Sequence, residues 1–180
     1  MNIFAISDCP VQSAKWMVDK HVVKMILKTC QLLSTAHRLI DGEEYVGKTA
    51  TGRNVKRWRL PDDRESVLYS ATHINHPSTV WCRASDGNYQ WLYQHLVALC
   101  EEYTHRYGKV HKAQRDGLVA ALAAFPKQIP MGLLSPVTPA MPDEYKVPGN
   151  SVESYRNYYR IAKERMHKWT KREPPEWLVA

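Results

Sequence analysis

One short stretch of the sequence gathers side chains that could do chemistry. Asp19, Lys20, His21 and Lys24 bring a carboxylate, an imidazole and two amines within about one helical turn. An amine of lowered pKa can attack a sugar C1′ and form a Schiff base, while a carboxylate or imidazole handles the proton and stabilises the developing positive charge. The alternative interpretation is an ordinary charged turn of a helix.

The α-amino group of Met1 is a further source of an amine. A free α-amino group titrates near ~7.7–8.0, well below a lysine amine, so it would be the better nucleophile at neutral pH. Asn2 is a large second residue, and we expect Met1 to be retained before it.

A stripe of cations continues along the same predicted helix. Lys20, Lys24, Lys28 and Gln31 recur every three or four residues and so share one face. Each pair of like charges at this spacing destabilises a helix by about a few tenths of a kcal/mol. The clustering of these cations is therefore explained if an anion lies alongside the helix. A solvated helix face is the alternative.

A second basic segment follows at residues 41–59, where we expect a loop or an irregular hairpin. After Glu44 it holds no acidic residue, and it carries an aromatic side chain among five cations: Lys48, Arg53, Lys56, Arg57, Trp58 and Arg59. Cations neutralise phosphates and an aromatic ring stacks on an exposed base, so this composition predicts nucleic-acid binding. The alternative is a structural Trp58 flanked by surface arginines.

The histidines and cysteines follow no standard metal-ligand spacing, and we expect neither a metal nor another cofactor. His73 and His76 should serve in capping and hydrogen bonding around the turn at Pro77. We also include both in the predicted nucleic-acid-binding set. The four cysteines are widely spaced, which is typical of reduced thiols in the cytoplasm, or in the host cytoplasm if the protein is viral.

Composition limits the class of protein. The 180 residues suit one domain over 1–180, and 25 basic against 18 acidic residues give a formal charge of +7, which favours a polyanionic partner. The first residues lack the pattern of a signal peptide. No segment approaches the ~20 apolar residues of a membrane span, so no membrane partner is expected.

The predicted fold is all-α: a compact bundle of five or six helices, with a short N-terminal strand over 1–6 at most. A Pro-rich coil over 126–149 should precede the C-terminal helix. Helices are expected at 10–39, 63–72, from Pro77 to an interruption at Asp86–Gly87, at 89–107 ending at Gly108, at 112–124, and at 151–170 with Ser151 as N-cap.

Three motifs in this order carry a resemblance to a known family. They are Asp19-x-His21, then Asn75-His76-Pro77 with Trp81, then the Tyr89–Tyr107 helix closed by Gly108. The set resembles the pyrimidine-dimer DNA glycosylases, the endonuclease V type of T-even phages, together with uncharacterised phage and bacterial relatives. The resemblance implies an all-α, phage-type enzyme that binds duplex DNA, extrudes a nucleotide, cleaves a glycosidic bond through an N-terminal amine and nicks the abasic site.

Applied to this sequence, the resemblance implies catalytic roles for Met1, Asp19 and His21. Two departures stand out. The family exposes its nucleophile by removing Met1 from before a small residue, and it carries an essential glutamate where this chain has Lys28. A cation cannot stabilise an oxocarbenium ion as a carboxylate can.

Three hypotheses follow. The first is a DNA glycosylase with abasic-site lyase activity, and the second is a catalytically silent DNA-binding protein of the same fold. The third is another base- or nucleotide-modifying enzyme with its site around His21, His73 and His76. The oligomeric state is not predicted.

Overall fold

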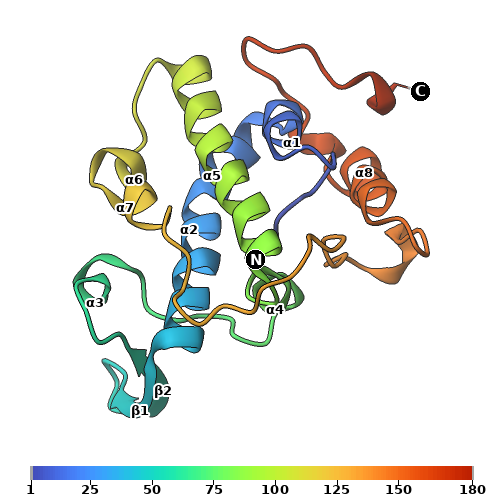
Figure 1. The fold of residues 1–180 in the computed structure, drawn as a ribbon. Coiled ribbons are helices and arrows are strands. Elements are labelled where there is room, and N and C mark those ends of the chain that lie inside the picture. Colours follow the sequence, from blue (N-terminus) through green and yellow to red (C-terminus); the bar gives the residue numbers. More distant parts are fainter. Residues whose placement is uncertain (1, 180) are drawn as a thin grey trace.

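The computed structural model describes residues 2–179, and two long helices form its frame (Figure 1). These are α2 (Asp19–Asp41) and α5 (Asp86–Tyr107), which pack against each other. Their facing sides are fully buried and aliphatic, with Ile26 and Leu33 from α2 and Leu92 and Leu96 from α5. Apolar positions at helical spacing explain this contact, because each helix must bury one stripe against a partner.

Shorter helices surround this pair. Helix α1 (Pro10–Trp16) packs along α5, and α4 (Pro77–Cys82) packs against α2. The remaining helices are α3 (Arg64–Val67), α6 (Lys112–Arg115), α7 (Leu118–Ala121) and α8 (Ser151–Ala162), with 3₁₀ turns η1 (Asp143–Tyr145), η2 (Glu164–Met166) and η3 (Glu176–Leu178).

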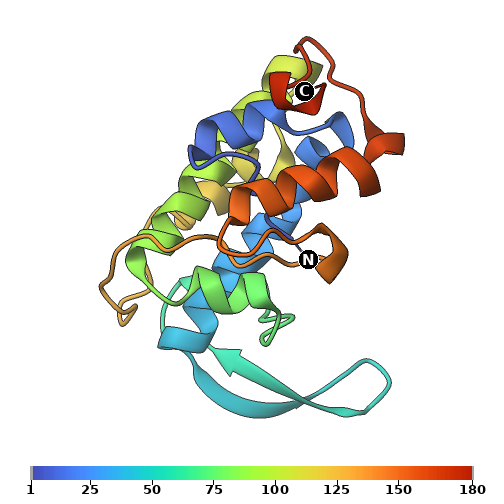
Figure 2. The same ribbon diagram turned by 90° about the vertical axis from the view of Figure 1, so that its right-hand side faces the viewer.

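The fold is mainly helical, and the strict all-α prediction is wrong in one element. Residues 2–6 form no strand, whereas β1 (Glu43–Lys48) and β2 (Asn54–Arg59) form an antiparallel hairpin. Figure 2 shows this hairpin projecting from the lower end of α2, beyond the helical body. The hairpin option for residues 41–59 is thereby confirmed, and the described residues contain eight α-helices, more than the five or six expected.

Tertiary contacts shorten several predicted helices. The expected helix at 10–39 is divided at Met17 and Val18, where the Tyr159 hydroxyl accepts the Val18 N–H. The helix expected at 63–72 stops at Val67 because the Arg38 guanidinium donates hydrogen bonds to the carbonyl oxygens of Leu68 and Tyr69. The last helix ends at Ala162 rather than Thr170, and its N-cap is Asn150 rather than Ser151.

Two glycines in α5 show opposite uses. Gly108 closes the helix in the left-handed conformation with φ 65°, as predicted. Gly87 does not interrupt the chain: it lies in the first turn of α5, capped by Ser85. A side chain at Gly87 would place Cβ 2.7 Å from the Gly132 carbonyl oxygen, so this position lets the Pro-rich coil approach the helix.

Candidate active site

A basic hollow of about 410 Å³ opens where α2, the end of α8, the Pro-rich coil and the N-terminal segment meet. Three lysines, several aromatic rings and no carboxylate line it, among the residues described: Asn2, Phe4, His21, Lys24, Met25, Lys28, Ala140, Tyr158, Lys163 and Met166. Such a lining attracts phosphate and offers planar faces for a sugar or a base. We call it the basic hollow below.

The N-terminal segment forms one wall of the basic hollow. The Asn2 side chain donates to the Ala140 carbonyl oxygen at 2.7 Å and accepts the Ile3 N–H at 2.8 Å, which fastens the start of the described chain. Phe4 adopts φ 55°, a conformation that bulky residues rarely take. The Ser13 hydroxyl supports this turn by donating to the Phe4 carbonyl and accepting the Ile6 N–H.

His21 lies at the base of the basic hollow and is 4% exposed. Its ring stacks on Phe4 with a centroid distance of 4.2 Å. Its Nδ1 lies 2.8 Å from the Tyr159 hydroxyl, whose oxygen already accepts the Val18 N–H. The hydroxyl hydrogen can therefore be donated to Nδ1, which leaves the proton of the neutral imidazole on Nε2.

Burial, together with the charges of Lys163 and Lys24, lowers the pKa of His21 to about 3. The imidazole is therefore neutral at physiological pH and can donate an Nε2–H without carrying charge. The positive charge of the basic hollow comes from the lysines. Lys163 places its Nζ 4.7 Å from the centre of the Tyr158 ring and 5.8 Å from that of Phe4.

The structure separates Asp19 from His21, although the two are close in sequence. Positions two apart on a helix point to different faces, and Asp19 is not among the residues that line the basic hollow. Its carboxylate accepts from Arg106 Nη1 at 2.9 Å and from the N–H and hydroxyl of Thr170 at 2.9 and 2.7 Å. Burial alone would raise the Asp19 pKa, but these hydrogen bonds lower it. Asp19 therefore fastens the C-terminal segment to α2.

The other predicted positions that the structure describes lie in several parts of the fold. Lys24 and Lys28 line the basic hollow, whereas exposed Lys20 does not. The hairpin carries Lys48, Arg53, Lys56, Arg57, Trp58 and Arg59. His76 caps α4 by accepting the Ser78 N–H at 3.1 Å, which confirms the capping prediction. His73 bonds Thr72 at 2.8 Å, and Met1 lies outside the described residues.

Sequence reasoning missed the partners that the fold brings to α2. Phe4, Tyr158 and Lys163 come from both ends of the chain, and the contact between His21 and Tyr159 spans 138 positions. The available signal is the mixture of tyrosines and cations around Tyr158 in the helix expected at 151–170.

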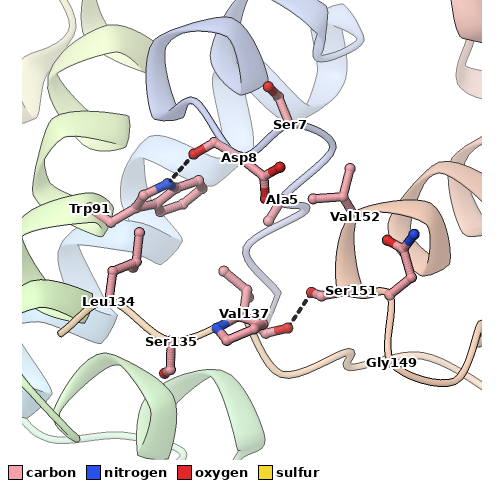
Figure 3. Close-up of a pocket in the computed structure, with 12 residues that line it drawn as sticks. Ala5, Ser7, Asp8, Trp91, Leu134, Ser135, Val137, Gly149, Ser151 and Val152 are labelled. Atoms are coloured by element: carbon pink, nitrogen blue, oxygen red, sulfur yellow. Dashed lines mark hydrogen bonds between the residues drawn. The ribbon is translucent and has the colours of Figure 1, made fainter.

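A second hollow, of about 430 Å³, lies between the N-terminal segment, α5, the Pro-rich coil and the start of α8 (Figure 3). Ala5 and Asp8 line it, together with Trp91 and the first residues of α8. The Trp91 indole donates to the Asp8 carbonyl oxygen at 2.7 Å, and the Ser151 hydroxyl bonds the Val137 carbonyl (Figure 3). No cationic side chain lines this hollow among residues 2–179, so it does not share the character of the basic hollow.

The protein is therefore mainly helical and has a cationic site beside its N-terminal segment. The family model of pyrimidine dimer DNA glycosylases matches residues 1–116, and the chain belongs to that family. The family indicates a glycosylase-type function with DNA as the partner. Neither the search of curated proteins nor that of solved structures gives a match.

Two features are absent from residues 2–179. No helix there is long and apolar enough to cross a membrane. No three side chains of histidine, cysteine, aspartate or glutamate are grouped so as to hold a metal ion.

Buried histidines should make the protein sensitive to mild acid. Burial lowers the pKa of His21 to about 3 and those of His37 and His95 to about 4. In the unfolded chain each takes up a proton near ~6.5. Between pH 6.5 and 4 the unfolded state binds more protons, so stability falls as the pH falls, by up to about 1.4 kcal/mol per pH unit for each histidine.

Urea unfolding at pH 7 and pH 5 measures this loss, in a range where carboxylates contribute little. His21→Gln should flatten the dependence, while His105→Gln, at an exposed position, should leave it unchanged. A free energy of unfolding that does not differ between pH 7 and pH 5 would contradict the burial of these three imidazoles.

Proposed function

We propose that this protein binds DNA at the basic hollow and acts on abasic sites as a Schiff-base lyase, with weak glycosylase activity. One observation carries the proposal: Lys24, Lys28 and Lys163 converge beside Asn2 in a hollow whose described lining holds no carboxylate. Cations suit the phosphates that flank a damaged nucleotide. The missing carboxylate disfavours the oxocarbenium-like step that cleaves an intact glycosidic bond.

The chemistry needs an unprotonated amine near the sugar, and we propose the α-amino group of Met1. Met1 precedes Asn2, which lines the basic hollow, and consecutive Cα atoms are about 3.8 Å apart. At pH 7 about one α-amino group in ten is unprotonated, against fewer than about one lysine amine in a thousand. Lys24 and Lys28 are the alternative nucleophiles.

The proposed reaction proceeds in balanced steps. The amine attacks C1′ of the open-chain aldehyde, and water leaves as the imine forms. Loss of the C2′ proton to water then breaks the C3′–O bond and releases the downstream strand with a 5′ phosphate, and a second water hydrolyses the imine to return the amine and leave an unsaturated aldehyde on the sugar. His21 Nε2–H is placed to donate a hydrogen bond to a sugar oxygen, and Asp19 acts only as a positioning residue.

Borohydride trapping tests the proposal. Protein mixed with an abasic duplex and cyanoborohydride should form a covalent adduct, and mass spectrometry should place it on Met1. A duplex with a tetrahydrofuran abasic analogue is the matched control, because it has no aldehyde and should give no adduct. An adduct on Lys24 or Lys28 would show that the nucleophile is misassigned.

A catalytically silent DNA-binding protein is the second candidate, and Lys28 favours it. DNA retention without any adduct would establish that function, and absence of DNA binding would exclude both. The third hypothesis, a modifying enzyme around His21, His73 and His76, loses support because neither His73 nor His76 lines the basic hollow.

A further inference from the structure

The β1–β2 hairpin is a projecting arm with a well-formed tip. Its strands pair in register from Glu43 with Arg59 to Lys48 with Asn54. The turn is closed by hydrogen bonds from the Thr49 N–H to the Arg53 carbonyl at 2.8 Å and from the Arg53 N–H to the Thr49 hydroxyl at 3.0 Å. An isolated two-stranded hairpin is marginal in water, so such an arm needs a firm base.

The base of the hairpin is fixed by one buried arginine. Arg38, 5% exposed, donates to the Trp58 carbonyl at 2.9 Å and pairs with Glu65 at 2.6 Å. The same Glu65 carboxylate accepts the Leu60 N–H at 2.8 Å, directly after β2. The arm is therefore anchored at one end and open to solvent at the other.

The two faces of the hairpin carry different groups. Cross-strand partners share a face, so Val46 and Lys56 stand together on one face with Lys48 and Asn54. Val46 is 68% exposed and Lys56 is 67% exposed, and Lys56 pairs only with surface Glu44. The same face carries Glu44 and Trp58 towards the base, and its outer part presents Val46 between Lys48 and Lys56.

On the other face the arginines lie along the ribbon. A Cβ at Gly47 would come within 2.7 Å of the Arg57 side chain, so the glycine makes room for Arg57 across the strand. The Arg59 guanidinium lies 4.5 Å from the centre of the Tyr45 ring. Arginines held flat beside a ribbon can reach phosphates on either side of a groove.

We propose that this hairpin is a β-ribbon arm that enters the major groove of a DNA duplex held at the basic hollow. This inference rests on the proposed function. The major groove of B-DNA, about 12 Å wide, admits a two-stranded ribbon. The deep, narrow major groove of duplex RNA does not, and a single strand has no groove, so the shape of the arm favours duplex DNA.

The distance between the arm and the basic hollow fits one duplex. From Lys28 to its end at Asp41, α2 spans about 20 Å at 1.5 Å per residue. This equals about six steps of B-DNA at 3.4 Å. Figure 2 shows the hairpin turn on the same side of α2 as the N-terminal segment, with the coil before α4 between them. The arm should therefore contact base pairs about half a helical turn from the reacting nucleotide.

The test compares two triple variants with the full-length wild type. Lys48→Gln/Arg53→Gln/Lys56→Gln removes three cations of the arm. The control, Lys109→Gln/Lys112→Gln/Arg115→Gln, removes three exposed cations beyond the end of α5. Each triple variant also breaks one surface ion pair, so the two are matched in this respect. Binding to 20-base-pair DNA, 20-base-pair RNA and single-stranded DNA is measured across salt, with thermal melts to confirm folding.

The arm variant should lose duplex-DNA affinity by on the order of 100-fold at 0.1 M salt, and its log–log salt slope should be shallower by about 2.7. The control triple should bind as wild type does. Borohydride trapping on an abasic duplex by the control triple should match that of the wild type.

Unchanged duplex affinity in a folded arm variant would overturn the inference. So would an equal loss on single-stranded DNA or duplex RNA, because the arm would then contribute charge and not groove fit. In both cases trapping by the wild type would leave the proposed function standing. Failure of the wild type to bind any DNA would overturn the proposed function and this inference together.

Discussion

Replacing Arg106 with methionine should lower the free energy of unfolding by about 3–5 kcal/mol. The Arg106 side chain is fully buried and lies between two carboxylates, with Asp19 at 2.9 Å and Glu102 at 2.9 Å. It also donates to the carbonyl oxygens of Lys15 and Met17. Methionine fills a similar volume but leaves two carboxylates and two carbonyl groups without this donor, which is the costly way to break a buried pair.

Urea unfolding measures the loss, and Arg115→Met is the matched control. Arg115 is 64% exposed and pairs with surface Asp116 at 3.5 Å, so its replacement should change stability by no more than about 0.5 kcal/mol. If Arg106→Met lies within 1 kcal/mol of wild type, the buried network does not hold the fold. Asp19→Asn gives a milder variant should Arg106→Met fail to fold, because Arg106 keeps its bonds to Glu102 and to the Lys15 and Met17 carbonyl oxygens.

This network explains how Asp19, which lies outside the basic hollow, holds the C-terminal segment in place. The Asp19 carboxylate accepts the Thr170 N–H, and the Asp19 backbone N–H donates to the Lys168 carbonyl oxygen at 2.9 Å. The segment held in this way follows Lys163, which lines the basic hollow. Losing Asp19 should therefore act through stability and placement of the C-terminal segment, and not through the loss of a group that touches the sugar.

Local patterns predicted the long elements well. The apolar period of α5 and its stop at Gly108 are local properties, and the structure confirms both. The break in the first predicted helix at Met17 and Val18 depends on Tyr159, and the early end of α3 depends on Arg38. Both partners are far away in the sequence, so local patterns do not predict these helix ends. The predicted N-terminal strand is wrong because the side chains of Ser13 and Arg156, and not a partner strand, bond the backbone groups of Phe4 and Ile6.

The candidate site also combines residues that local spacing predicts with residues that only tertiary packing brings in. His21, Lys24 and Lys28 share one face of a helix, so sequence spacing alone groups them. Asp19 was grouped with them by closeness in sequence, but its face of the helix meets Arg106. Phe4, Tyr158 and Lys163 reach the basic hollow only through packing of distant segments, which no spacing within one element can reveal.

Replacing Lys28 with glutamate should change binding and cleavage in opposite directions. Lys28 lines the basic hollow together with Asn2 and His21, at the position where the resemblance places a glutamate. The substitution removes one phosphate contact and adds a repulsive charge, so DNA affinity should fall by roughly tenfold and the salt slope should become shallower by about 1. The new carboxylate would face the sugar and stabilise the positive charge that develops as the glycosidic bond breaks.

Cleavage of DNA containing a pyrimidine dimer should therefore rise by on the order of 100-fold, the factor that a single well-placed stabilising group is worth. Single-turnover assays with saturating protein separate this gain from the weaker binding. Lys28→Gln is the first control: it removes the cation without supplying an anion, so it should weaken binding and leave cleavage low. Lys20→Glu is the second, because it reverses a charge on the same helix outside the basic hollow. If Lys28→Glu cleaves no faster than Lys28→Gln, the absence of a carboxylate at this position is not what limits glycosidic cleavage.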